Sequence, residues 1–159
     1  MNKIQASNPF FEIYSTPHGT VPFNLIKTEH YAPAIHEGIR RQNGEIDAII
    51  NNPDAPTFEN TIVPYEKSGE LLHRVNTVFG NLLSAETDDE LQELAREIMP
   101  LMSEHENNIS LNEKLFARIK TVYELADKAK LTPEQSKLLE DIYTGFVRNG
   151  ANLQGDAKE

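Results

Sequence analysis

The 159-residue sequence contains no cysteine, which excludes disulfides, thiol catalysis and thiolate metal ligands. This fits a reducing compartment without requiring one. Basic residues are also scarce: 15 Lys and Arg stand against 25 Asp and Glu, giving a formal net charge of -10. A nucleic-acid-binding protein needs a basic surface to displace counterions, so we expect no nucleic-acid partner. No apolar run approaches the roughly 18 residues that span a bilayer, so we expect no membrane partner.

Motifs that carry chemistry are missing as well. The sequence has no phosphate-binding G-x-x-x-x-G-K-[ST] and no G-x-S-x-G. Residues 36–40 read H-E-G-I-R, which begins like the zinc motif H-E-x-x-H but places Arg40 where the second histidine belongs. Residues 105–109 fail in the same way, with Ile109 in the ligand position. We therefore expect no catalytic, cofactor-binding or metal-binding residue in this chain, and ordinary helix histidines at both places.

The first 27 residues differ in composition from the rest. They contain Pro9, Pro17 and Pro22, which rule out a long helix, yet they are too apolar for a solvated tail. The pattern predicts an extended arm over residues 1–27, packed on the body of the protein. A helical domain follows over residues 28–150, and residues 151–159 are expected to form a flexible tail.

Helical periodicity runs through the remainder, and no stretch alternates convincingly with the period of a strand. The expected fold class is all-α, an antiparallel bundle in which short connections make consecutive helices neighbours. Thr57, Thr87, Asn112 and Thr132 are the expected N-caps. The helices are predicted near 28–51, 57–84, 88–108, 113–129 and 133–149.

Two features of these helices raise questions. Pro64 lies seven residues past the Thr57 cap and removes the hydrogen bond to the carbonyl of Asn60, which predicts a kink over residues 60–63. Two separate helices are the alternative. The helix at 133–149 has a wide apolar stripe, which predicts self-association through an exposed patch. An ordinary core helix packed on two neighbours is the alternative. The stripe consists of Leu138, Leu139, Ile142, Tyr143, Phe146 and Val147.

Several stretches resemble one known family. Residues 52–62 read N-P-D-A-P-T-F-E-N-T-I, and residues 66–72 read E-K-S-G-E-L-L. Upstream, residues 22–39 read P-F-N-L-I-K-T-E-H-Y-A-P-A-I-H-E-G-I, and residues 83–124 and 146–153 continue the likeness. In this order the motifs resemble the N-terminal region of the thimet-oligopeptidase family of zinc metallopeptidases, above all its bacterial peptidyl-dipeptidase (dipeptidyl carboxypeptidase) and oligopeptidase A branch. The resemblance covers about residues 8 to 153, and Pro64 departs from it.

The resemblance implies that this chain is an N-terminal helical fragment of a zinc metallopeptidase that hydrolyses short peptides. Family members continue for several hundred residues, and their H-E-x-x-H helix and other zinc and substrate ligands lie in that part. No catalytic residue is therefore carried over, and zinc belongs to the longer parent, not to this chain. The implied partners are the catalytic domain of the same polypeptide and short peptides, which this region helps to admit by walling a deep channel.

Other interpretations remain open. The chain is alternatively a free-standing acidic helical module that binds other proteins, or a complete small metalloenzyme. We expect a cytoplasmic location, with an exported protein whose signal has been removed as the alternative. Neither peptide preference nor the choice between dipeptidase and endopeptidase action follows from the sequence.

Overall fold

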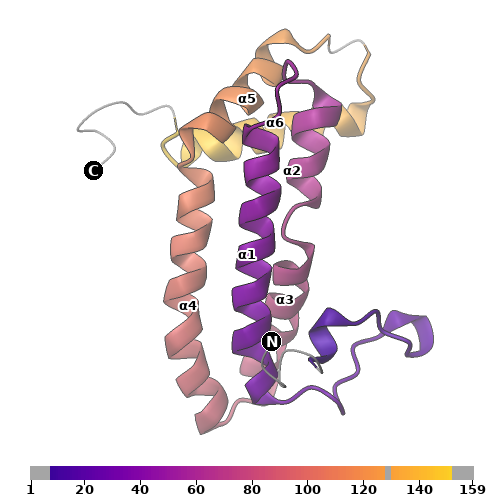
Figure 1. Ribbon diagram of the computed structural model, residues 1–159, viewed down its shortest axis with the longest axis vertical. Coiled ribbons are helices and arrows are strands. Elements are labelled where there is room, and N and C mark those ends of the chain that lie inside the picture. The colour runs from indigo at the N-terminus through magenta and orange to yellow at the C-terminus, as the bar shows by residue number, and fades with distance from the viewer. Residues whose placement is uncertain (1–7, 128–129, 152–159) are drawn as a thin grey trace. The chain divides into compact units, whose positions relative to one another are not determined.

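The computed structural model describes residues 8–127 and 130–151. Within these ranges it contains helices and turns but no strand (Figure 1), which confirms the all-α prediction. None of the helices in this described part is long and apolar enough to cross a membrane. In chain order the elements are η2 (Pro9–Phe11), η3 (Pro17–Gly19), η4 (Thr28–His30), α1 (Tyr31–Ile50), the π-helical turn η5 (Phe58–Ile62), α2 (Val63–Lys67), α3 (Glu70–Ala85), α4 (Asp89–Ser110), α5 (Glu113–Leu125) and α6 (Pro133–Arg148).

Local hydrogen bonds explain where the last two helices begin. The side chain of Asn112 accepts a hydrogen bond of 3.0 Å from the Leu115 amide, so the predicted cap of α5 is confirmed. At α6, the Thr132 hydroxyl accepts from the Gln135 amide at 3.2 Å, and the Gln135 side chain accepts from the Thr132 amide at 3.0 Å. This reciprocal pair confirms the predicted capping box, with proline at the tolerated first helical position.

The predicted cap of α4 is wrong by one residue. The acceptor is Asp88, whose carboxylate takes a hydrogen bond of 2.7 Å from the Leu91 amide, and not Thr87. An ionised carboxylate is a stronger acceptor than a hydroxyl and also suits the positive end of the helix dipole. The helix consequently starts at Asp89.

The prediction of one kinked helix over 57–84 is wrong in its details. Thr57 caps the segment as predicted. The residues before Pro64 form the π-helical turn η5, so the proline lies in the first turn of α2, where its missing N–H is not needed. The interruption comes later, where Ser68 is extended (ψ 149°) and Gly69 has a φ of 74°. Glycine adopts such a left-handed φ without steric cost. The segment therefore forms two separate α-helices, which is the alternative that the sequence analysis left open.

The described chain divides into two compact units, each with its own core. Unit 1 contains the residues up to Asn43 together with Gly69–Ser103. In unit 1, α3 runs antiparallel to α1 (Figure 1), and the two helices approach so closely that a Cβ on Gly38 would lie 3.0 Å from the Leu72 Cα. The fully buried side chains of this core come from the arm, α1, α3 and α4: Phe10, Tyr31, Ala34, Ile35, Val75 and Ile98.

Unit 2 contains Gly44–Ser68 and the described residues from Glu104 onwards. Within it, α6 turns back against α5 (Figure 1). Its core includes an aromatic group in which the Phe116 ring stacks on Phe146 at 6.0 Å and on Tyr143 at 5.8 Å, and Tyr143 stacks on Tyr123 at 4.0 Å. The other buried side chains of this core are Ile46, Ile49, Phe58, Ile62, Leu115, Ile119, Val122 and Leu139.

The apolar stripe of α6 faces this core. Leu139 and Phe146 are buried, and the other four stripe residues are half-buried and pack against the same cluster. The expected exposed patch on this helix is therefore wrong, and the alternative of a core helix fits the structure. The wide stripe arises because α6 packs on both α5 and α2, where Tyr65 lies 5.6 Å from Phe146. Self-association through α6 stays a prediction, but it has lost its structural premise.

The predicted ends of the chain are only partly within the described residues. The arm segment from residue 8 to 27 contains η2 and η3 and contributes Phe10 to the core of unit 1, while residues 1–7 lie outside the described part. The predicted tail beyond Ala151 also lies outside it. The helix predicted to reach residue 129 ends at Leu125, because Ala126 turns to an extended ψ of 127°. The predicted division into arm, helical domain and tail stays a prediction.

Candidate functional site

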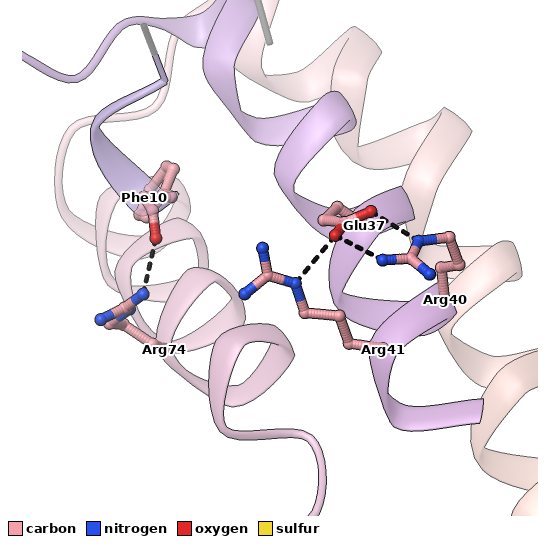
Figure 2. Close-up of polar contacts among 5 residues, drawn as sticks. All are labelled: Phe10, Glu37, Arg40, Arg41 and Arg74. Atoms are coloured by element: carbon pink, nitrogen blue, oxygen red, sulfur yellow. Dashed lines mark hydrogen bonds and ion pairs between the residues drawn. The ribbon is translucent and has the colours of Figure 1, made fainter. Parts of the chain in front are cut away.

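Of the two stretches that begin like the zinc motif, the one at residues 36–40 lies on α1 and the one at residues 105–109 lies largely on α4. Glu37 of the H-E-G-I-R run accepts two hydrogen bonds of 2.8 Å from the Arg40 guanidinium and one of 2.8 Å from Arg41 Nε (Figure 2). The bonds from Arg40 and then Arg41 lower the pKa of Glu37 to about 2. A general base near neutral pH needs a pKa close to the working pH. Glu37 is instead ionised near neutral pH and paired with two arginines.

The histidines of this region do not fit a zinc site. His36 is exposed on α1, and burial lowers the pKa of His105 on α4. Zinc sites in proteins use three or four converging ligands. Across residues 8–127 and 130–151, no group of three or more histidines and carboxylates could hold a metal ion. The residues present therefore do not fit zinc, and the expectation that this chain holds none stays a prediction.

Within unit 1, Arg41 of α1 and Arg74 of α3 hold the arm against these two helices. One nitrogen of the Arg74 guanidinium donates a hydrogen bond of 2.6 Å to the Phe10 carbonyl (Figure 2), and its Cζ lies 5.2 Å from the ring centre of Tyr14. Arg41 Cζ lies 5.8 Å from the ring centre of Phe11. A guanidinium over an aromatic face is attracted by the ring quadrupole. We call residues 8–14, with these two arginines, the arm contact.

The E-H-Y motif of residues 29–31 also has a structural role in unit 1. The His30 carbonyl accepts a hydrogen bond of 2.8 Å from the Asn8 side chain, and its Nδ1 accepts one of 3.0 Å from the Lys27 amide. Tyr31 lies between the rings of Phe10 at 5.2 Å and Phe79 at 5.3 Å. Burial, with a smaller effect from Tyr14, raises the pKa of Tyr31 to about 12. The motif fixes the chain where the arm enters α1.

The N-P-D-A-P-T-F-E-N motif folds into a clamped turn in unit 2. Asn52 accepts a hydrogen bond of 2.9 Å from the Asp54 amide, and Thr57 and Asn60 form a reciprocal cap at 2.8 and 3.2 Å. Arg118 of α5 donates to the carbonyls of Asn52 at 3.0 Å and Asp54 at 3.2 Å, and to the Asn60 side chain at 3.5 Å. These bonds account for the polar residues of the motif without catalysis.

Sequence analysis singled out none of the arginines that make these long-range contacts. Arg74 reaches 64 residues back along the chain, and Arg118 reaches 58 to 66. Neither takes part in a local cap or turn pattern, and although Arg118 lies in the 83–124 stretch of the resemblance, that stretch does not show what it contacts. His36 and His105, the two histidines that the sequence analysis weighed and did not assign to a site, belong to no group of three or more possible metal ligands among the described residues.

Comparison with known proteins places the chain beside peptidases. No protein-family model matches it. It is 41% identical over 146 residues to dipeptidyl carboxypeptidase of Escherichia coli, which is 92% of this chain and 21% of that protein. It is 39% identical over 153 residues to dipeptidyl carboxypeptidase of Salmonella typhimurium, and 27% identical over 153 residues to oligopeptidase A of Haemophilus influenzae.

These similarities confirm the resemblance that the sequence motifs predict. They extend over 92% to 96% of this chain for the three relatives named, whereas the chain spans only about a fifth of each relative's length. The relatives are peptidases by name. Their activity is attached to polypeptides about five times as long as the stretch that matches.

Proposed function

We propose that the chain is the N-terminal helical part of a peptidyl-dipeptidase-like zinc metallopeptidase that hydrolyses short peptides, and that it contributes no catalytic residue of its own. The observation that carries the proposal is the 41% identity over 92% of the chain to a dipeptidyl carboxypeptidase of which it covers 21%. Zinc would supply a metal-activated water when bound. Its ligands would lie outside this chain, since the residues described here do not fit the ion.

The role of this part is to build a wall of the channel that admits peptides. Two small cores and two arginine clamps, Arg74 in unit 1 and Arg118 in unit 2, support such a role, because a wall must keep its shape without taking part in the reaction. The partners are then the remainder of the same polypeptide and, through it, short peptides. The cytoplasmic location belongs to this proposal too.

Two measurements on the gene and its product test the proposal. The reading frame past Glu159 should stay open and encode an H-E-x-x-H segment. A stop codon directly after Glu159 would favour the free-standing acidic module instead. Metal analysis of the 159-residue chain after dialysis should find no stoichiometric zinc, with His36→Ala as a matched control that changes nothing. One zinc per chain that is lost in His36→Ala would overturn the proposal in favour of a small metalloenzyme.

A further inference from the structure

The second half of the arm contains a well-held turn, residues 21–26, which we call the Phe23 turn. The Phe23 amide donates to the Val21 carbonyl at 2.9 Å, the Leu25 amide to the Pro22 carbonyl at 2.9 Å, and the Ile26 amide to the Phe23 carbonyl at 3.3 Å. Pro22 is buried, and Val21 and Ile26 pack against the core of unit 1. The backbone of the turn is therefore anchored at both ends.

This anchored turn presents apolar side chains to solvent. Phe23 is 54% exposed and Leu25 57% exposed, and Ile13 on the same arm is 93% exposed. In the described part of the chain, the other exposed large apolar residues are Met99, Leu111 and Leu125, each from a different helix or turn. Single exposed apolar residues are ordinary, but a phenylalanine and a leucine two positions apart on a fixed turn resemble the anchors of a binding surface.

The polar neighbours of the turn complete the pattern of such a surface. Asn24 is exposed between the two apolar side chains, and Lys27 and Glu29 form an exposed ion pair of 3.9 Å directly after the turn. Protein interfaces commonly have an apolar centre with a polar rim. The fitting partner is a surface with an apolar pocket that takes an aromatic ring.

We propose that the Phe23 turn docks into an apolar pocket on the remainder of the peptidase polypeptide, an inference that rests on the proposed function. About four fifths of each relative's length has no counterpart in this chain, so most of the polypeptide that would cover the turn lies outside it. The arm contact holds residues 8–14 against α1 and α3 of unit 1. The Phe23 turn binds the remainder of the polypeptide, so that the arm connects α1 and α3 of unit 1 to the rest of the enzyme.

Hydrogen exchange of the arm tests this directly. The amides of Phe23, Leu25 and Ile26 are compared in the 159-residue chain and in the product of the complete reading frame. We expect exchange at least about tenfold slower in the longer product, because docking suppresses local opening of the turn. The segment around Leu125, which is 77% exposed in unit 2, is the internal control and should exchange equally in both.

Variants of the two anchors give the second readout. Phe23→Ser combined with Leu25→Ser should leave the melting temperature of the 159-residue chain unchanged but abolish the added protection in the longer product. Leu125→Ser, the matched control, should change neither. If the double variant unfolds the short chain, the two side chains belong to the core and the inference is wrong.

The outcomes separate the inference from the proposed function. A longer product that hydrolyses peptides but leaves the turn unprotected overturns the inference alone. Protection without peptide hydrolysis overturns the proposed function, and with it the identity of the docking partner. Protection that grows with the concentration of the short chain alone would assign the turn to a second copy and contradict the inference.

Discussion

The Arg118 clamp is the clearest case in which a motif of the resemblance can be tested for a purely structural role. Replacing Arg118 by Met keeps much of the apolar stem while removing every hydrogen bond to the turn. The bonds lost are those to the Asn52 carbonyl at 3.0 Å, the Asp54 carbonyl at 3.2 Å and the Asn60 side chain at 3.5 Å. If Arg118 holds this turn in place, its replacement must lower the free energy of unfolding.

The magnitude follows from these contacts. Two hydrogen bonds from a charged donor stabilise by about 1.5 kcal/mol each, at the low end of the range because Asp54 is exposed to water. The third bond is too long to count. Against this, Arg118 Nε is buried with no acceptor among the described residues, and removing it recovers about 1 kcal/mol. The net expectation is a loss of about 2 kcal/mol.

Urea unfolding followed by near-ultraviolet circular dichroism measures this loss. With a slope of about 2 kcal/mol per molar urea, the midpoint should fall by about 1 M. Arg118→Lys should recover only part, because one ammonium cannot span two carbonyls as a guanidinium does. Arg96→Met is the matched control: Arg96 pairs with exposed Glu93 at 3.0 Å, and its replacement should change little. An unchanged midpoint for Arg118→Met would refute the clamp and reopen a functional role for the turn.

Three further variants test unit 1. The pKa of Glu37 is lowered to about 2, so its ion pairs stabilise the fold above about pH 4.5 and are lost as the pH falls towards 2. Glu37→Gln should therefore reduce the loss of unfolding free energy over that pH window, by no more than about 1 kcal/mol because water screens the pairs. An unchanged acid profile would contradict this. The pKa of Tyr31 is raised to about 12, so the tyrosine ionises first in the unfolded chain and the stability of the fold falls as the pH rises from 10 to 12. Tyr31→Phe should remove this part of the stability loss in a pH series of thermal melts. An equal loss in the variant would contradict a buried neutral phenol. Gly69→Ala should lower the free energy of unfolding in urea by about 1–2 kcal/mol, since Gly69 has a φ of 74° and the new Cβ would lie 2.5 Å from the Gln42 side chain. A neutral or stabilised variant would show that an alanine fits the break between α2 and α3 without strain.

Sequence reasoning succeeded where structure is decided within a few residues. The caps at Asn112 and Thr132 act over three positions, so a single motif contains both partners of each hydrogen bond. The all-α class followed in the same way from helical periodicity. The error at Thr87 was of this local kind as well, since Asp88 beside it offers a stronger acceptor.

The break after α2 shows a local signal overridden by a longer pattern. Ser68-Gly69 is a dipeptide typical of turns, but the apolar period from Phe58 to Val75 continues across it and suggested one helix. The kink predicted from Pro64 was placed wrongly, because the π-helical turn η5 accommodates the proline. The apolar period continues because residues on both sides of the break are buried, although in different units.

The contacts that hold the arm and the turn could not be predicted. Arg74 meets the Phe10 carbonyl, and Arg118 meets the Asn52 carbonyl, only after segments more than sixty residues apart have packed together. Nothing near either arginine in the sequence marks it. The sequence likewise predicts an apolar arm packed on the body, but it does not show that Phe23 and Leu25 of this arm are exposed.

The release of dipeptides tests the central proposal most directly. A short peptide blocked at its N-terminus is incubated with zinc and either the product of the complete reading frame or the 159-residue chain, and the products are identified by mass spectrometry. If this chain is the non-catalytic helical part of a peptidyl-dipeptidase, the longer product should release dipeptides from the C-terminus of the peptide and the 159-residue chain none. Dipeptide release by the 159-residue chain alone, or no peptide hydrolysis by the longer product, would contradict the proposal.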